Sequence, residues 1–353
     1  MNKQAIYLFL FIYLHFFGPV FSQELAKSEQ DNQVTELFLK NDALPVKLSY
    51  SNKVLRKETN DSTYIDSEIG YMTSDESWKT LEVKIRARGN YRRENCYFPP
   101  VKMKIKKSVS AGTLFEGNKK LKLVLPCVLQ KDYNDKVLKE YMAYKLYEFV
   151  SPYHFKTRLL NIDFTDEKGQ KVKTYTVKGF FIEDIDEVKD RCNGKQITRS
   201  IHPLEQDDLC SVRNDFFQFM IGNTDYSSAY RHNEKLLFVD NNIMPVPYDF
   251  DMSGLVDASY AVVSQVQGEV LSITDVTQRL YRGFKRNPAI YQTVRSEFLN
   301  NKSKMMTVVN DLESSFDDPK EFATARRFIS DFFDVLANDN SYRKEILNVA
   351  RLK

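Results

Sequence analysis

The chain has 353 residues, and its 51 Lys and Arg against 48 Asp and Glu give a net charge of only +3. Its four histidines and four cysteines show no zinc-type spacing, which argues against a zinc or His-rich centre. No nucleic-acid partner is expected. The length is sufficient for two packed lobes or domains.

Residues 1–22 are typical of a secretory signal peptide: a charged start at Lys3, an apolar run over residues 5–17, and a cleavage point after Ser22. The apolar run is shorter than the about 20 residues that a membrane span needs, and an uncleaved anchor is the alternative. The polar residues 23–33 indicate a flexible lead-in. We therefore expect an exported protein, periplasmic or secreted, with no integral membrane span after cleavage.

Four cysteines in an exported chain favour disulfides. We expect Cys96 to pair with Cys127 and Cys192 to pair with Cys210. Four free thiols are the alternative, because spacing does not fix connectivity.

Residues 34–184 are predicted to form a β-rich N-terminal lobe with one inserted helix. Alternating apolar and polar residues predict strands over 45–50, 63–72, 81–88, 101–106, 121–125, 158–164 and 173–182. In the clearest of them, Val101–Lys106, the lysines share one face and the apolar residues share the other. The inserted helix is expected over 134–149, with Asn134 as its N-cap.

Residues 185–353 are predicted to form a mostly helical C-terminal lobe. One helix is expected over 208–221, ending at Gly222. Later helix starts are expected at Asp275, at Pro288, at 317–319 and at 340–341. The fold class is therefore α+β, with a β-rich lobe followed by a helical lobe.

Charge is unevenly distributed along the chain. Between Lys84 and Lys122 there are twelve Lys or Arg and two Glu, whereas residues 183–190 are acidic. A basic first half favours an anionic ligand such as phosphate, and a solvated strand face is the alternative.

A β-hairpin is predicted within residues 222–254, where two apolar runs flank a polar turn. Antiparallel strands place their outer ends side by side. Asp225 and Asn233 before the hairpin should therefore lie beside Asp249 and Asp251 after it. Such oxygen ligands suit Mg²⁺, which also holds phosphate oxygens.

These residues follow the chain order of a kinase-type phosphoryl-transfer site. The parts are Lys102 or Lys104 on a strand, Glu140 on the following helix, Asp225, Asn233, and Asp249 or Asp251. We expect the lysine and Glu140 to steady the phosphates and Asp225 to accept or orient the substrate hydroxyl. Asn233 and the later aspartates would hold the metal.

Several segments also carry a family resemblance over about residues 81–254. They are Arg88–Asn90, Val101–Lys104, Leu138–Leu146, Gly179–Asp184, Asn223–Asp225, His232–Asn233 and Pro247–Asp251. With these segments the chain resembles, distantly, the CotH kinase family of atypical kinases and uncharacterised exported proteins related to it. The resemblance implies a two-lobed atypical protein-kinase-like fold that uses ATP and Mg²⁺ to phosphorylate a secreted or envelope protein. It also implies that the strand with Glu183 lies near the adenine.

Two alternatives remain at this point. Tyr248 stands where the family usually has tryptophan, and Glu140 stands where it often has asparagine. These departures favour a catalytically inactive kinase-like binding module of the cell envelope. A hydrolase that uses Asp225 and Asp249 as acid and base is the other alternative.

Overall fold

The structure is a computed structural model that describes residues 34–89, 91–129, 131–169, 171–264, 268 and 270–352. The predicted signal peptide (1–22), the predicted lead-in (23–33) and Asn90 lie outside the described residues. Within the described part, no helix combines the length and the apolarity that a bilayer crossing requires.

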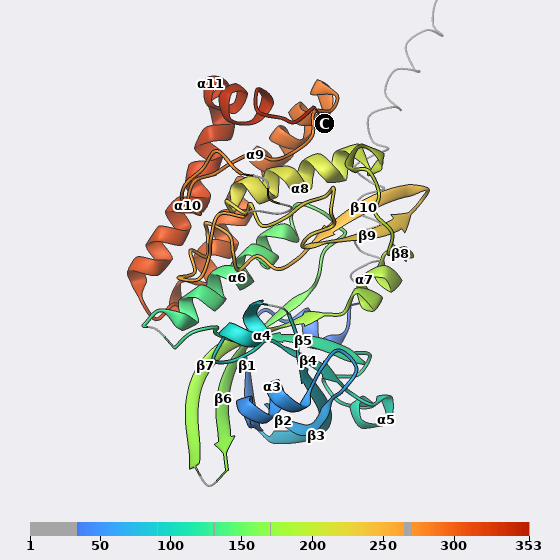
Figure 1. The fold of residues 1–353 in the computed structure, drawn as a ribbon, viewed down its shortest axis with the longest axis vertical. Helices are drawn as coiled ribbons and strands as arrows, with labels where there is room; N and C mark the ends of the chain where they lie inside the picture. Colours follow the sequence, from blue (N-terminus) through green and yellow to red (C-terminus); the bar gives the residue numbers. More distant parts are fainter. Residues whose placement is uncertain are drawn as a thin grey trace, which may run out of the picture. The chain divides into compact units, whose positions relative to one another are not determined.

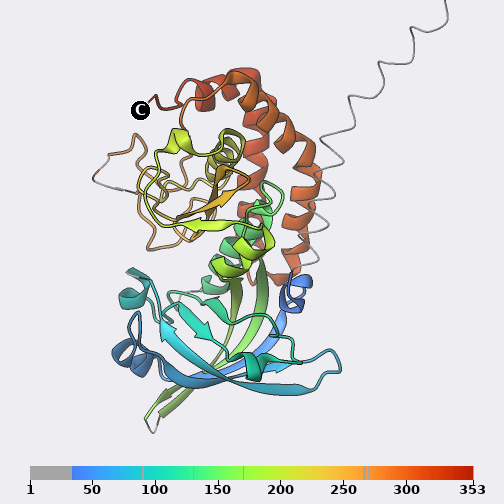
Figure 2. The same cartoon turned by 90° about the vertical axis from the view of Figure 1, so that its right-hand side faces the viewer.

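Seven strands of the N-terminal half close into a barrel in the order β1-β2-β3-β4-β5-β7-β6 (Figures 1 and 2). The strands are β1 (Leu44–Tyr50), β2 (Ile65–Met72), β3 (Trp78–Ala87), β4 (Val101–Lys104), β5 (Lys120–Val124), β6 (Thr157–Lys168) and β7 (Lys171–Glu183). Neighbouring strands are antiparallel except β1 and β6, which run parallel and close the barrel, with Tyr50 opposite Asp166.

The interior of the barrel is apolar, and its exterior carries the cations. In β4, Val101 and Met103 are fully buried, whereas Lys102 and Lys104 lie on the other face. The predicted division of this strand into a lysine face and an apolar face is therefore confirmed. Because the side-chain period of a strand is two, the alternation in the sequence fixes which residues face the core.

The closed barrel shows that the predicted two-lobed kinase-like fold is wrong, although the α+β mixture is right. Closure depends on the parallel pairing of β1 with β6, two strands that lie far apart in the chain. Alternation shows which face of a strand is buried, but it carries no information about such a distant partner. The sequence therefore predicted strands in the right places and assembled them into the wrong architecture.

One long helix, α6 (Tyr133–Tyr147), lies between the barrel and the C-terminal helices (Figure 1). It is buried on most sides because β6 and β7 pack on it from the barrel, and α9 and α10 from the other direction. The predicted cap is wrong, since Asp132 precedes the helix. The Asn134 side chain instead accepts from the Lys178 amide (2.8 Å) and donates to Asp317 (2.8 Å).

The N-terminal half also contains short helices that the sequence did not predict. They are α2 (Glu36–Leu39), α3 (Asn52–Glu58), α4 (Tyr91–Asn95), α5 (Lys107–Ser110) and α7 (Ile185–Arg191). Most of them span only one or two turns, which is too short for an apolar period to be recognised. Two of them, α3 and α4, turn out to line the sites described below.

The C-terminal half contains a second, three-stranded antiparallel sheet in the order β10-β9-β8. Its strands are β8 (Lys195–Ile197), β9 (Glu234–Val239) and β10 (Asn242–Pro247). The predicted hairpin is confirmed: Asp240 and Asn241 have φ of 47° and 61°, so a two-residue turn of the type that suits hairpins joins β9 to β10.

The remaining helices pack together beyond this sheet. They are α8 (Asp208–Met220), α9 (Pro288–Asp311), α10 (Pro319–Ala337) and α11 (Asp339–Tyr342), with short 3₁₀ turns at Pro203–Glu205 and Glu313–Ser315 and a π-helical turn at Arg343–Leu347. Gly222 follows α8 with a positive φ of 62°, as predicted for a helix end. No helix begins at Asp275, because this side chain accepts hydrogen bonds from Thr277 and forms a local turn instead.

The cysteines follow the prediction in one pair and not in the other. Cys96 and Cys127 form a disulfide. Cys192 and Cys210 are free and buried, and burial raises their pKa values to about 11 and about 12. The predicted second disulfide is therefore wrong, and both side chains pack in the core as neutral thiols.

We expect alkylation of the denatured, non-reduced protein to modify Cys192 and Cys210 and to leave Cys96 and Cys127 unmodified. In the folded protein Cys192 and Cys210 should react slowly, because both thiols are buried and carry raised pKa values. Peptide mass spectrometry after iodoacetamide treatment measures this. Recovery of a Cys192–Cys210 linked peptide would contradict the structure.

Candidate functional site

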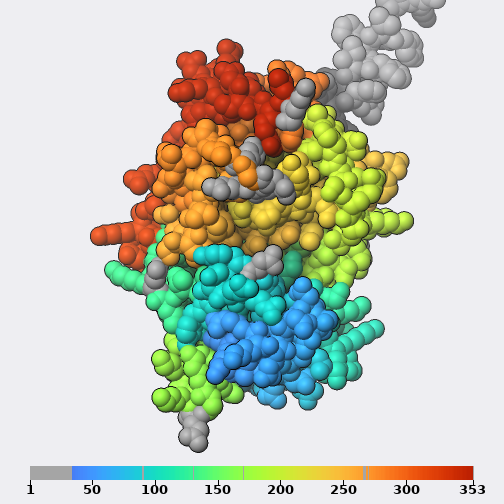
Figure 3. All heavy atoms as spheres, in the orientation of Figure 1, coloured from blue at the N-terminus to red at the C-terminus, as the bar shows by residue number. Residues whose placement is uncertain are grey.

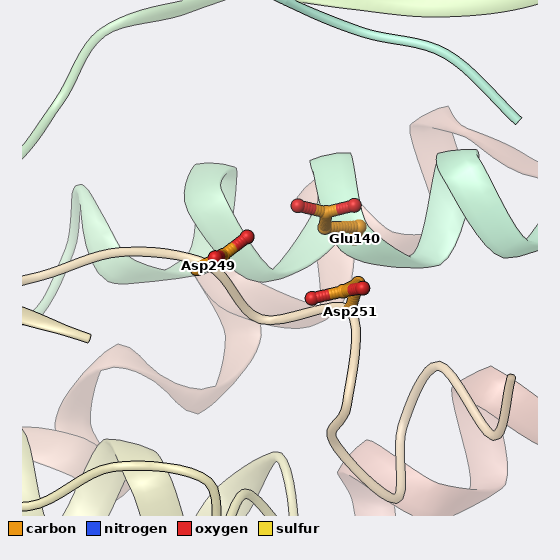
Figure 4. Close-up of side chains that lie close together, drawn as sticks. All are labelled: Glu140, Asp249 and Asp251. Carbon is orange, nitrogen blue, oxygen red and sulfur yellow. The ribbon is translucent and has the colours of Figure 1, made fainter. Parts of the chain in front are cut away.

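Three carboxylates from two separate segments converge at one point (Figure 4). Glu140 comes from α6, and Asp249 and Asp251 follow β10. One oxygen of each side chain lies within 4.8 Å of the others. Glu140 and Asp251 are buried, and Asp249 is half-buried. We call these three residues the carboxylate cluster.

The end of the hairpin directs Asp249 toward α6. Hairpin pairing continues one residue past β10, because the Tyr248 amide donates to the Asn233 carbonyl (3.0 Å). Asp249 and Asn233 then adopt positive φ values of 66° and 55°, a conformation that Asp and Asn reach more readily than most residues. The Asp249 amide donates to the Tyr144 hydroxyl of α6 (2.9 Å), which fixes the segment against the helix.

Phe250 anchors the same segment in the core. It is fully buried, and its ring lies 4.6 Å from the Tyr144 ring and 5.2 Å from the Phe217 ring, measured between centroids. Asp249 and Asp251, which flank Phe250 in the chain, lie beside Glu140 of α6 (Figure 4).

Arg92 of α4 supplies positive charge to the carboxylate cluster. Its Nη1 lies 3.4 Å from Glu140 Oε2 and 3.5 Å from Asp251 Oδ2. Its Nη2 donates to the Leu125 carbonyl at the end of β5 (3.0 Å). One guanidinium faces three carboxylates, so negative charge remains in excess when all three are ionised.

A disulfide and hydrogen bonds fix the position of the helix α4. The disulfide joins Cys96, next to its last residue, to Cys127 beyond β5. Arg93 donates to backbone carbonyls of α3 and its C-cap. The Tyr91 ring packs on Tyr260, with 6.1 Å between the ring centroids. In the space-filling view of Figure 3, cyan and orange parts of the chain lie against each other.

Burial shifts the titration of the cluster. It raises the pKa of Glu140 to about 8 and that of Asp251 to about 6, against the opposing effect of Arg92. Glu140 is 2% exposed, and its Oε1 has no hydrogen-bond partner among the described residues. A buried, unpartnered carboxylate oxygen is costly unless a proton or a cation binds there. The cluster can therefore supply oxygen ligands to a hard divalent cation such as Mg²⁺.

Three side chains hold the carboxylate of Asp225, which is not part of the carboxylate cluster. Its Oδ1 contacts His232 Nε2 (3.1 Å) and accepts from Ser264 Oγ (3.2 Å), and its Oδ2 accepts from Asn233 Nδ2 (3.0 Å). The hydrogen bond to Asp225 raises the pKa of His232. The charge of Asp225 also contributes to the raised pKa of Asp251, so the two carboxylates are within electrostatic reach. Asn233 thus positions Asp225.

A group of cations from β3 to β5 and from β9 lies near Tyr248. We call Arg88, Lys102, Lys122 and Lys235 the basic cluster. Lys102 and Lys122 are directly opposite each other on β4 and β5. Burial, together with the charges of the other three cations, lowers the pKa of Lys122 to about 7. Like charges at such cross-strand positions are unfavourable, so the cluster favours binding of an anion.

Two aromatic rings lie beside the ammonium of Lys122. Its Nζ lies 4.7 Å from the Phe155 ring centroid and 5.3 Å from that of Tyr248. Lys102, in contrast, already pairs with Asp184 at 3.5 Å. Arg88 connects the basic cluster to the carboxylate cluster, because its charge lowers the pKa of both Lys122 and Glu140.

Two predicted nucleotide ligands lie in other surroundings. Lys104 is exposed, and its Nζ lies 4.1 Å from the Tyr64 ring centroid. Glu183 is buried and accepts two hydrogen bonds from Arg191 (2.7 and 2.8 Å) and one from the Lys156 amide (2.6 Å). Its oxygens therefore hold the end of β7 against α7.

Sequence reasoning missed Arg92 and Lys122 as site residues. The excess of Lys and Arg between Lys84 and Lys122 was the signal for both. Selecting among twelve cations requires the register of β3, β4 and β5 and the position of α4, and neither can be read from one chain. The sequence selected Glu140, Asp249 and Asp251 individually, but it predicted that Glu140 pairs with Lys102 or Lys104. In the structure Glu140 contacts Arg92, and Lys102 pairs with Asp184.

No protein-family model and no curated protein matches this chain. The resemblance to the CotH kinase family therefore stays a prediction, as do the ATP and Mg²⁺ that it implies.

A buried polar network supports the Asp225 loop. Asp215 of α8 accepts a hydrogen bond from the Tyr226 hydroxyl (3.1 Å). Arg282 donates to the backbone carbonyls of Thr224 (2.6 Å) and Tyr226 (3.0 Å). The loop is therefore fixed from both sides of Asp225.

The pH dependence of stability should report on Asp215. Burial raises its pKa from 3.8 to about 6, so the folded state holds this proton more tightly than the unfolded state. Its contribution to the free energy of unfolding is therefore largest below pH 4 and is lost as the pH rises to 6. Relative to the wild type, Asp215→Asn should gain about 2–3 kcal/mol between pH 4 and pH 7.

Urea unfolding of both proteins at several pH values measures this difference. Asp311→Asn, at an exposed carboxylate, is the matched control and should follow the wild-type curve. A constant difference between Asp215→Asn and the wild type across this range would show that Asp215 titrates normally.

Loss of the unpartnered carboxylate should weaken cation binding. Glu140→Gln removes one ligand charge, so the Mn²⁺ dissociation constant should rise about tenfold or more. Its stability in EDTA should not fall by a large amount, because Arg92 keeps Asp251 and the Leu125 carbonyl as partners. Electron paramagnetic resonance titration with Mn²⁺ measures free and bound ion.

Glu82→Gln is the matched control, since Glu82 is an exposed carboxylate on β3. It should bind Mn²⁺ as the wild type does. Equal affinity of wild type and Glu140→Gln would exclude Glu140 as a ligand.

Proposed function

We propose that this chain is an exported phosphotransferase that uses Mg–ATP to phosphorylate a secreted or envelope protein. The observation that carries the proposal is the proximity of the carboxylate cluster, with its unpartnered Glu140 oxygen, to the basic cluster. The disulfide Cys96–Cys127 and the signal-like first 22 residues support export.

The two clusters suit the two parts of a metal–polyphosphate complex. Oxygen ligands in the carboxylate cluster match a hard divalent cation, and the basic cluster matches phosphate oxygens. Arg88 acts electrostatically on both clusters, so one extended anion can contact both. A nucleotide triphosphate with its bound cation has this charge pattern.

Asp225 is the group proposed to handle the acceptor hydroxyl. Asn233 and Ser264 hold its carboxylate by hydrogen bonds of 3.0 and 3.2 Å. It would accept the proton as the hydroxyl oxygen bonds to the γ-phosphorus and the bond from that phosphorus to ADP breaks. The proposal rests on this geometry and does not require a kinase fold.

A binding module without turnover is the second candidate. The observation in its favour is that both carboxylate oxygens of Asp225 already take part in hydrogen bonds, one of them with His232. The raised pKa of His232 favours an imidazolium paired with Asp225. An aspartate held in this way is a weaker proton acceptor.

Mg–ATP should stabilise the protein by about 2.7 kcal/mol at 100 times its dissociation constant. Autophosphorylation, or phosphorylation of a generic protein substrate, should be detectable with γ-labelled ATP. Asp225→Asn should keep the stabilisation and lose the label, because it removes a proton acceptor and leaves both clusters intact. Thermal unfolding and radiolabel transfer are the two measurements.

Two lysine variants test which lysine contacts the nucleotide. Lys122→Met should lose most of the stabilisation, whereas Lys104→Met should keep it, because Lys104 lies over Tyr64 and outside the basic cluster. Stabilisation without any label in the wild type would select the binding module. Absence of stabilisation by Mg–ATP would end both versions of the proposal.

A further inference from the structure

A separate cavity lies at the far end of the barrel, between α3 and the end of β6. Its volume is about 640 Å³, within the range typical of small-molecule sites. Figures 1 and 2 place α3 and the β6–β7 hairpin on the side of the barrel away from the C-terminal helices. No lining residue is shared with the pocket around Arg92 and Glu140.

The wall of this cavity contains a buried amide side chain without partners. Asn52 is 2% exposed, and neither its Oδ1 nor its Nδ2 has a hydrogen-bond partner among the described residues. Its backbone amide, in contrast, donates to Asp166 Oδ1 (3.0 Å). An unsatisfied buried amide costs about 1–3 kcal/mol. A ligand hydroxyl, which both donates and accepts, can satisfy such a group.

Cations outnumber the available anions around the cavity. Lys53 and Lys57 are exposed, one helical turn apart on α3, and have no ion-pair partner among the described residues. Lys168 lines the opposite wall, where its Nζ pairs with Asp166 Oδ2 (3.3 Å) and donates to the Tyr97 hydroxyl (3.1 Å). Asp166 is fully buried and accepts from the Tyr97 hydroxyl (3.1 Å) as well as from Asn52.

The wall also contains the carboxylates Glu58, Asp166 and Glu167, so its four cations exceed its three anions by one charge. Glu167 accepts from the Ser49 hydroxyl (2.5 Å), and Glu58 is exposed. Arg56 adds a fourth cation, whose guanidinium donates to the carbonyls of Cys96 and Tyr97. The wall of the cavity therefore has a net positive charge, the Asn52 amide without a hydrogen-bond partner among the described residues, and the side chain of Tyr97.

We propose that this cavity binds a small sugar that carries an oxyanion, either a carboxylate or a phosphate. Lys53 and Lys57 bind the oxyanion, and a ring hydroxyl pairs with the Asn52 amide. This site is independent of the phosphotransferase site, and the two proposals can succeed or fail separately.

Isothermal titration of the signal-free chain with D-glucuronate, glucose 6-phosphate, glucose and inorganic phosphate tests the proposal. At least one of the two anionic sugars should bind, and glucose should bind at least about tenfold more weakly, because it lacks the charge-assisted contacts. The double variant Lys53→Gln/Lys57→Gln should lose about tenfold or more in affinity for the anionic sugar. These lysines are exposed, so the variant should fold.

The matched control is Lys79→Gln/Lys119→Gln, which removes the same charge from exposed lysines elsewhere on the barrel. It should bind as the wild type does, and the stabilisation by Mg–ATP should be the same in both double variants. Asn52→Ser, which shortens the amide, should weaken binding of the anionic sugar.

Three outcomes would overturn the proposal. The first is no binding of either anionic sugar up to about 10 mM, which is weaker than the binding of most specific small ligands. The second is unchanged affinity in Lys53→Gln/Lys57→Gln. The third is binding of inorganic phosphate as tight as that of glucose 6-phosphate, or of glucose as tight as that of glucuronate, since either result removes the sugar or the oxyanion from recognition.

Discussion

The contact of Arg92 with Glu140 and Asp251 joins the three parts of the molecule that make the candidate site. The guanidinium also donates to the Leu125 carbonyl, so it links the barrel, α6 and the segment after β10 through one side chain. Both carboxylates are buried, and a buried charge without a partner is strongly destabilising. The position of α4, and with it the Cys96–Cys127 disulfide, therefore determines whether the carboxylates can stay together.

The site combines shifted pKa values of opposite kinds, which do not stabilise the fold by themselves. Two buried acids have raised pKa values and one lysine has a lowered one, all within electrostatic reach of Arg88 or Arg92. Such opposed shifts cluster at functional sites more than in ordinary cores. A bound cation would lower the energy of the acids, and a bound anion would lower that of the lysines. A metal–anion complex would meet both needs together, and this is the reason that we propose phosphate chemistry for the site.

The sequence was informative where local rules decide the structure. Alternation placed the lysine and apolar faces of β4, and a polar turn at Asp240–Asn241 gave the hairpin that brings Asp249 and Asp251 to Glu140. The sequence was uninformative where contacts between segments far apart in the chain determine the structure. Closure of the barrel by β1 and β6, the choice of Arg92 over eleven other cations, and the free state of Cys192 and Cys210 all depend on contacts between remote segments.

The hairpin register explains why the catalytic candidates meet at all. Six residues of β9 pair with six of β10 across a two-residue turn, and one further pair joins Tyr248 to Asn233. A shift of one residue would turn each side chain of β10 to the opposite face of the sheet, because successive side chains of a strand alternate, and would displace the segment that follows it. The buried Phe250 resists that shift, and the positive φ at Asn233 and Asp249 ends the pairing at this point. The spacing between Asp225 and the carboxylate cluster is thus set by core packing and turn geometry, and the polar residues occupy positions that the apolar ones fix.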